Sequence, residues 1–315
     1  MMAPMLPFVF AVLSSLAPVE GDVDGEPEQT EVVTSDEPAP EPEPAPEYAA
    51  APTAAPAERA TLPDIRFRVA IDVPILVGFS SVFFVTEGFK RKIAPQTCRW
   101  CIPGPAGRGI RDALVWKDPE AAALTSDIVA YAGIPAVALT LTLVGVGTEG
   151  QWRRIHEDLL VALEAVAVSG ALTNVIKFST ARLRPYAYYE PVTFDEDPDH
   201  NLSFPSGHTS LAFAMATSFA TVATMRRRKL APVFWGLGVP MAGLVGYLRM
   251  AGDRHWLGDV LTGAGLGTLV GVGLPWLLHH PRTGVIPRAS RRESSAVSSL
   301  MIMPTGNGVV VAGRW

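Results

Sequence analysis

Residues 257–278 read LGDVLTGAGLGTLVGVGLPWLL, an apolar run whose single charged residue, Asp259, lies near its start. A helix needs about 20 mostly apolar residues to cross the hydrocarbon core of a bilayer. Gly263, Gly267 and Gly271 recur at every fourth position, and small residues at this spacing let membrane helices approach each other closely. The stretch therefore predicts a membrane helix that packs tightly against a neighbour.

Five further apolar segments precede this one. By hydropathy they cover residues 69–89, 124–146, 159–176, 209–225 and 231–247. The first of them is the weakest, because Asp72, Pro74 and Glu87 interrupt it. Only helices and closed barrels satisfy their backbone groups inside lipid, and no alternating barrel pattern recurs. The sequence thus predicts an all-α, integral membrane six-helix bundle with a disordered N-terminal spacer and a short C-terminal tail.

The composition agrees with this class. Of the 315 residues, 48% are hydrophobic and 18% are charged, whereas soluble domains carry about 25% charged residues. The apolar fraction excludes a collagen-like or wholly disordered chain. The presence of only two cysteines excludes a scaffold built on disulfides.

The two ends of the chain differ from its middle. Residues 1–19 are predicted to be a signal peptide or an uncleaved apolar N-terminus. Residues 20–62 hold twelve acids, one base and eight prolines, so we expect a disordered acidic spacer. Residues 63–278 form the predicted membrane domain. The polar tail, 279–315, contains two β-prone runs around residues 305–308 that predict a hairpin.

Basic residues in the short loops indicate the orientation. The run 226–229, RRRK, predicts a cytoplasmic loop between the fourth and fifth segments. The loops after the third and fifth segments would then face the exterior. The basic run 90–92, KRK, disagrees with this topology, as does a cleaved signal peptide, so the crossing of the first segment stays open.

Charged residues are costly near a membrane, so three clusters at segment edges are candidates for function. The first is KFSTARLRP, residues 177–185, in which Lys177 and Arg184 are two helical turns apart. Two cations on one face would make an anion clamp, and the guanidinium suits phosphate. The alternative is a pair of basic residues that snorkel at a helix end.

The second cluster is FPSGHTS, residues 204–210, at the start of the fourth segment. Ser206 and Gly207 would leave free N–H groups at a helix start, where an anion binds well, and His208 would lie in the first turn. Alone, such a stretch is usually just a helix cap.

The third cluster is RMAGDRHWLGD, residues 249–259. His255 and Asp259 are one turn apart, so the carboxylate could accept a hydrogen bond from one imidazole nitrogen and leave the other as a nucleophile. Arg249 adds a third cation. Alone, the pair would more often be a structural hydrogen bond; together, the clusters supply a nucleophile, a general acid and an anion clamp.

These three motifs, K-x6-R-P, P-S-G-H and R-x5-H-x3-D, resemble the signature of the type 2 phosphatidic acid phosphatase superfamily. Bacterial nonspecific acid phosphatases and vanadium haloperoxidases share this signature. The resemblance covers roughly residues 67–278. One departure is Leu248, where the family commonly has serine before the arginine.

The resemblance implies a role for each motif residue. His255, oriented by Asp259, would attack phosphorus and form a phosphohistidine, and His208 would protonate the leaving oxygen. The phosphoryl oxygens would be bound by the remaining motif residues, which are Lys177, Arg184, Ser206, Gly207 and Arg249. No metal or other cofactor is implied. The expected partners are a lipid phosphate substrate and the bilayer, with no nucleic acid. The expected location is a bacterial cell membrane, with the site facing the periplasm or exterior.

Two alternatives remain open at this stage. A non-enzymatic phospholipid-binding or transport protein would keep the cations but would not need His208 or the pair His255 and Asp259. A vanadate-dependent haloperoxidase would use the same residues, although the membrane bundle argues against it.

Other polar residues receive simpler interpretations. Cys98 and Cys101 form a CRWC motif that is either redox-active or a local disulfide. The acidic run 195–199 is interpreted as a solvated loop that could also gate anionic head groups. Four histidines lack matching partners in the sequence and are predicted to lie on the surface: His156, His200, His279 and His280.

Overall fold

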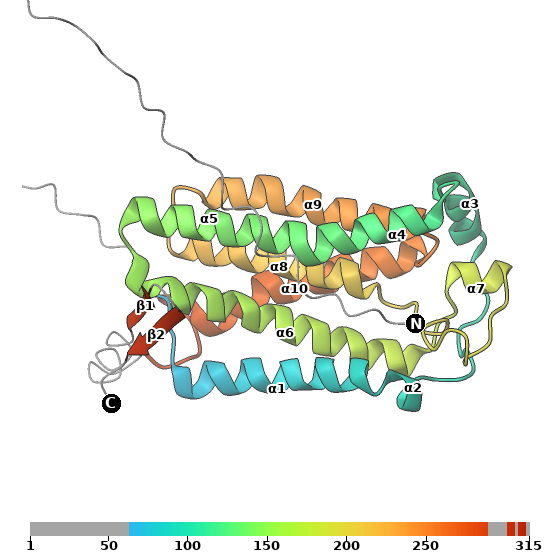
Figure 1. Cartoon of the computed structure of the whole chain (residues 1–315), viewed down its shortest axis with the longest axis horizontal. Coiled ribbons are helices and arrows are strands. Elements are labelled where there is room, and N and C mark those ends of the chain that lie inside the picture. The colour runs from blue at the N-terminus through green and yellow to red at the C-terminus, as the bar shows by residue number, and fades with distance from the viewer. Residues whose placement is uncertain (1–62, 289–300, 306–307, 313–315) are drawn as a thin grey trace, which may run out of the picture. The chain divides into compact units, whose positions relative to one another are not determined.

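The computed structural model describes residues 63–288, 301–305 and 308–312; the predicted signal stretch, the spacer and the hairpin turn 306–307 lie outside these ranges. The helices, shown in Figure 1, are α1 (Val69–Gly88), α2 (Lys90–Ile93), α3 (Pro105–Leu114), α4 (Pro119–Ile128), η1 (Val129–Gly133), α5 (Ile134–Glu149), η2 (Trp152–Arg154), α6 (Ile155–Thr180), α7 (Pro185–Tyr189), α8 (Gly207–Met225), α9 (Ala231–Ala251) and α10 (Leu257–His279). Strands β1 (Met301–Thr305) and β2 (Gly308–Ala312) pair antiparallel.

The bundle is all-helical, as predicted, and its long helices lie side by side (Figure 1). Among the described residues, five helical stretches are long and apolar enough to cross a membrane. They are Val69–Gly88, Pro119–Glu149, Trp152–Thr180, Ala231–Ala251 and Leu257–His279. The second runs without a break through α4, η1 and α5.

Helix α8 covers the remaining predicted segment and differs from the other five. It packs against α6, α9 and α10, and most of its side chains are buried alanines, serines and threonines. A helix that is surrounded by other helices need not present a strongly apolar surface. This explains why α8 is not among the five apolar stretches.

The glycines of α10 let it approach α8 closely. A Cβ atom at Gly263 would lie 2.6 Å from the Ser206 carbonyl oxygen, and one at Gly271 would lie 2.7 Å from the Ala214 carbonyl oxygen. A Cβ at Gly267 would overlap the Ser210 carbonyl oxygen. The glycines at every fourth position therefore form the face of α10 that contacts α8, as the sequence indicates.

The basic run 226–229 is not a set of solvated loop cations. Arg226 is completely buried and its Nε atom donates to Asp158 at 2.8 Å. Arg228 is buried too, and it donates to Asp158 and, at 2.9 Å, to Glu149. Two of the four cations that were expected to mark the cytoplasmic side are thus neutralised inside the bundle, which weakens them as topological markers.

The bundle has two functionally distinct ends. At one end α6 ends, α8 begins, α9 ends and α10 begins, so the three sequence motifs meet there. At the other end α1 and α6 begin and α10 ends (Figure 1).

Candidate functional site

A cavity of about 590 Å³ opens at the end of the bundle where the motifs meet. Five of the residues singled out from the sequence line it: Lys177, Arg184, Gly207, His208 and Arg249. The helix ends bring these residues together from three different stretches of the chain.

Lys177 lies in the last turn of α6, beside the first residue of α8. A Cβ at Gly207 would lie 3.0 Å from the Lys177 Nζ atom, so the missing side chain leaves room for the ammonium group. The first-turn N–H groups of a helix have no partner within the helix, and its dipole favours an anion. The ammonium and the α8 N-terminus therefore attract negative charge to the same part of the cavity.

Arg184 is held by Asp199, which belongs to the acidic run 195–199. Its Nε atom donates to the Asp199 backbone carbonyl at 2.9 Å, and the Asp199 carboxylate lies 3.0 Å from Lys90. Burial raises the pKa of the Asp199 carboxyl, but the cations Arg184 and Lys90 outweigh this effect and lower the pKa to about 2. The run is a loop, and its residues Asp195 and Glu196 are exposed. Asp197 and Asp199, however, line the cavity, and the alternative that the run gates anionic head groups stays a prediction.

Lys90, from the basic run that disagreed with the predicted topology, lines the same cavity. Its Nζ atom lies 2.5 Å from Glu87 and 3.0 Å from Asp199. Burial lowers the pKa of Lys90, but these two carboxylates outweigh this effect and raise the pKa above its ordinary value. Lys90 is therefore a fixed cation of the site rather than a marker of membrane orientation.

His208 and Arg249 share one carboxylate. The Asp127 Oδ1 atom lies 2.9 Å from His208 Nε2 and accepts a hydrogen bond from Arg249 at 3.0 Å. The Tyr131 ring lies edge-on to His208, with ring centroids 4.9 Å apart. Asp127 and Tyr131 belong to the second apolar segment, which carries none of the three motifs, so the sequence gave no signal for either.

His255 is buried, with 2% of its surface exposed, and is not among the residues that line the cavity. Its Nδ1 atom lies 2.7 Å from the Ser203 carbonyl oxygen, whereas the Asp259 carboxylate is 3.8 Å away. A hydrogen bond donated to the carbonyl places the free lone pair on Nε2. Burial, together with the nearby cations Arg184 and Arg249, lowers the pKa of His255 well below its ordinary value.

Asp259 differs from the expected arrangement, in which it accepts a hydrogen bond from His255. Its carboxylate accepts from Arg182 at 2.6 Å, from the Ser203 hydroxyl at 2.5 Å and from the Trp256 N–H at 2.9 Å. Because it holds Ser203, Asp259 acts on His255 through the Ser203 carbonyl.

The cysteine loop supports the same network. Cys98 and Cys101 form a disulfide around Trp100, whose ring stacks 3.7 Å from the Arg182 guanidinium. The Leu183 N–H donates to the Trp100 carbonyl at 3.1 Å. Of the two interpretations of the CRWC motif, the structure has the local disulfide.

Two motif positions contribute packing in this structure. Ser206 is buried and its hydroxyl accepts a hydrogen bond from Thr209 at 2.9 Å, and it is not among the residues that line the cavity. Leu248 packs with Ala122 and Ala251 in a buried apolar cluster, which explains why an apolar residue is accommodated where the family commonly has serine.

The structure also corrects the interpretation of two histidines as surface residues. His200 is buried and its Nδ1 atom lies 2.6 Å from the Asp197 carbonyl oxygen. His279 is fully buried at the other end of the bundle.

The geometry brings two imidazoles and several buried cations together at one end of the bundle, an arrangement that suits a strongly anionic group. Residues 158–282 match the family model of the PAP2 superfamily. The resemblance seen in the motifs is therefore confirmed.

Relatives of known name agree with this assignment. The chain is 32% identical to a lipid A 1-phosphatase of Porphyromonas gingivalis over 55% of the chain and 36% of the relative. It is 30% identical to an undecaprenyl-diphosphatase of Sulfolobus acidocaldarius over 44% of the chain and 60% of the relative. The match thus spans between about a third and three fifths of the length of these relatives. A transmembrane PAP2-type phosphatidylglycerolphosphate phosphatase of Bacillus subtilis aligns with a TM-score of 0.40 at 18% identity, covering 64% of this chain and 93% of the other.

Proposed function

We propose that this protein is a membrane-embedded phosphatase that hydrolyses a lipid phosphate or diphosphate through a phosphohistidine intermediate. The observation that carries the proposal is the convergence of both motif histidines with Lys177, Arg184 and Arg249 at one end of the bundle. We assign the catalytic domain to residues 63–278. The proposed chemistry requires no metal or other cofactor.

In the first step, His255 Nε2 attacks phosphorus. A P–N bond forms while the bond from phosphorus to the leaving oxygen breaks, and His208 donates a proton to that oxygen. The low pKa of His255 supports this role, because the ring is then neutral and nucleophilic at neutral pH. The positive charges stabilise the negative charge on the phosphoryl oxygens in the transition state.

In the second step, water attacks the phosphohistidine. His208, now without its proton, accepts one from the water, the P–N bond breaks, and inorganic phosphate leaves. Asp127 holds the His208 ring at 2.9 Å in the absence of substrate. Asp259 would serve as a positioning residue, because it holds the Ser203 backbone that accepts the His255 hydrogen bond.

The apolar part of the cavity lining supports a lipid as the substrate. Phe83 of α1 and Leu124 of α4 line the cavity together with the cations, and both helices are candidate membrane spans. An amphipathic molecule could place its phosphate among the cations and its acyl or prenyl chain along these helices. The substrates named for the relatives, a lipid A 1-phosphate and undecaprenyl diphosphate, are of this kind.

The membrane arrangement completes the proposal. We infer that α8 is a sixth crossing, enclosed by the other helices, and that the catalytic end faces the periplasm or exterior of a bacterial cell membrane. With six crossings, α1 begins and α10 ends on the cytoplasmic side.

The test is phosphate release by the detergent-purified protein from lipid A 1-phosphate, undecaprenyl diphosphate, phosphatidic acid and phosphatidylglycerol phosphate, with excess chelator. His255→Ala should abolish release, while His280→Ala, a matched histidine at the other end, should not. Wild-type enzyme quenched in alkaline denaturant, which preserves the acid-labile P–N bond, should carry labelled phosphate when the substrate is labelled, and His255→Ala should not.

Other outcomes would redirect the assignment. If the folded wild-type protein releases no phosphate from any lipid but binds them, a binding or transport function is correct. If an oxidation activity appears only with added vanadate, the haloperoxidase alternative is correct.

A further inference from the structure

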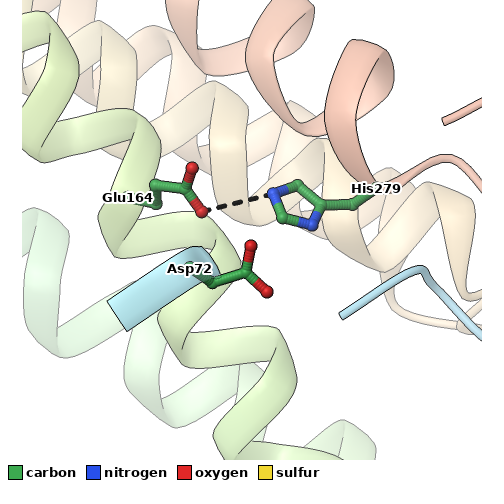
Figure 2. A group of neighbouring side chains, drawn as sticks. All are labelled: Asp72, Glu164 and His279. Atoms are coloured by element: carbon green, nitrogen blue, oxygen red, sulfur yellow. Dashed lines mark ion pairs between the residues drawn. The ribbon is translucent and has the colours of Figure 1, made fainter. Parts of the chain in front are cut away.

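Three buried titratable side chains meet at the end of the bundle that is remote from the catalytic motifs. Asp72 comes from the first turn of α1, Glu164 from α6 and His279 from the last residue of α10 (Figure 2). Each is at most 1% exposed. Asp259 and His279 are twenty residues apart on α10, so the two sites are separated by about 30 Å at a rise of about 1.5 Å per residue.

The His279 ring is fixed in the tautomer that a metal ligand requires. Its Nδ1 atom lies 2.7 Å from the Arg66 carbonyl oxygen, and the Arg66 N–H donates back to the His279 carbonyl at 2.9 Å. An Nδ1–H group that donates to a backbone carbonyl leaves the Nε2 lone pair free, which is the usual support of a metal-binding histidine. Figure 2 shows the other ring nitrogen directed at Glu164.

Several polar atoms of this cluster have no hydrogen-bond partner among the described residues. They are both carboxylate oxygens of Glu164, the Oδ1 atom of Asp72 and the Nε2 atom of His279. The other Asp72 oxygen accepts the Arg68 N–H at 2.7 Å, so that carboxylate is oriented with Oδ1 free. Buried polar atoms are nearly always paired, so unpaired ones require an explanation.

The distances match a metal ion with nitrogen and oxygen ligands. One ligand atom from each of the three residues lies within 4.8 Å of the other two. The His279 Nε2 and Glu164 Oε2 atoms are 3.3 Å apart without hydrogen-bond geometry. Ligands at about 2.0–2.2 Å from a tetrahedral zinc ion lie about 3.3–3.6 Å from each other. The His279–Glu164 distance already fits, and the other pairs, within 4.8 Å, would approach by at most about 1.5 Å on metal binding.

We propose that Asp72, Glu164 and His279 bind a divalent first-row transition metal ion, such as Zn²⁺, that ties the start of α1 to α6 and to the end of α10. One imidazole with two carboxylates suits such an ion better than Ca²⁺ or Mg²⁺, which prefer six or more oxygen ligands. The +2 charge would balance the two carboxylates. Its role is structural, and it does not depend on the proposed phosphatase chemistry.

The experiment uses the full chain, purified in detergent without a histidine tag, stripped with chelator and then equilibrated with Zn²⁺. After desalting, elemental analysis should find about one zinc per chain. The Glu164→Gln variant, which keeps the shape of the side chain, should retain at least tenfold less zinc than the wild type. Glu157→Gln is the matched control, because Glu157 lies on the same end of α6 but pairs with Arg226, and it should bind zinc like the wild type.

Thermal unfolding gives a second readout. At free Zn²⁺ about a hundredfold above Kd, the midpoint of the wild-type protein should rise by about 5–10 °C, and that of Glu164→Gln should not change. If Glu164→Gln fails to fold, visible absorption bands of the Co²⁺-loaded wild-type protein decide the matter.

Three results would overturn the proposal: no retained metal with no thermal shift in the wild type, equal retention in both variants, or a Co²⁺ spectrum of the hexaaqua ion only. Phosphate release is measured on the same samples. Because His255→Ala should lose turnover and still bind zinc, failure of this proposal and failure of the phosphatase assignment are distinguishable.

Discussion

Replacing Gly263 by alanine should damage catalysis by moving α8 relative to α10. A Cβ at this position would lie 2.6 Å from the Ser206 carbonyl oxygen, whereas ordinary contacts begin at 3.4 Å. The two backbones must therefore separate by about 0.8 Å, the difference between these distances. Ser206 immediately precedes Gly207 and His208, so the separation occurs where α8 enters the proposed catalytic site.

We expect kcat/KM of Gly263→Ala to fall by about 10- to 100-fold, because a misplacement of about 1 Å can cost on the order of a hundredfold in rate. Overpacking should also cost about 1–3 kcal/mol of unfolding free energy, which lowers the thermal midpoint by about 2–12 °C for a domain of this size. The protein should remain folded at the assay temperature.

Gly265→Ala is the matched control two residues along the same helix. A Cβ there meets nothing within 4 Å, and alanine favours a helix interior over glycine by about 0.5–1 kcal/mol. The thermal unfolding midpoint of Gly265→Ala should stay level or rise, and its kcat/KM should not change. Phosphate release and differential scanning fluorimetry on both variants test this. Equal kcat/KM and equal midpoints for the two would refute the inferred role of the glycine face.

Two further predictions concern the charges of the site. In a histidine-selective NMR titration of the substrate-free protein, the His255 ring should stay neutral at pH 6, and a midpoint at or above its ordinary 6.5 would contradict the lowered pKa. Since only the unfolded chain then binds this proton, the His255 contribution to stability should diminish as pH falls below about 6.5. Asp127→Asn should lower kcat most for poor leaving groups, because the His208 ring loses its anionic partner, and should lower KM by freeing Arg249 from a competing carboxylate. A kcat loss independent of the leaving group would argue against this role.

The helices could be predicted because their signals are local. The apolar run 257–278 predicts α10 almost to the residue, and its glycine spacing predicts the face that meets α8. Helix ends were less predictable. Helix α6 begins at Ile155, four residues before the predicted segment. The prediction began late because Glu157 and Asp158 lower the hydropathy of the first turn. Those acids lie inside the helix because Arg226 pairs with both of them.

The motif residues of the site could be predicted, whereas their partners could not. Lys90 and Asp199 lie far apart in the sequence, and only folding places their charges 3.0 Å apart. His255 and Asp259 were predicted to lie one helical turn apart, but His255 precedes the N-cap of α10 and is not in the helix, and local competitors take the hydrogen bond. Asp259 is in the first turn of α10 and accepts the Trp256 N–H, and the Ser203 carbonyl becomes the nearer partner of His255.

In most of the bundle, carboxylates are paired with basic side chains. The cluster of Asp72, Glu164 and His279 at the remote end is the exception. At the proposed catalytic end, Asp199 holds the cations Lys90 and Arg184. Asp127 there holds the cation Arg249 and the imidazole of His208. At the other end, Asp158 is likewise held between two arginines. Glu164 lies on the same helix and is equally buried, yet its oxygens have no hydrogen-bond donor among the described residues. His279 lies 3.3 Å from Glu164 but without hydrogen-bond geometry. Since an incompletely compensated buried charge is destabilising, a bound cation is the component that would bring this cluster into line with the rest of the molecule.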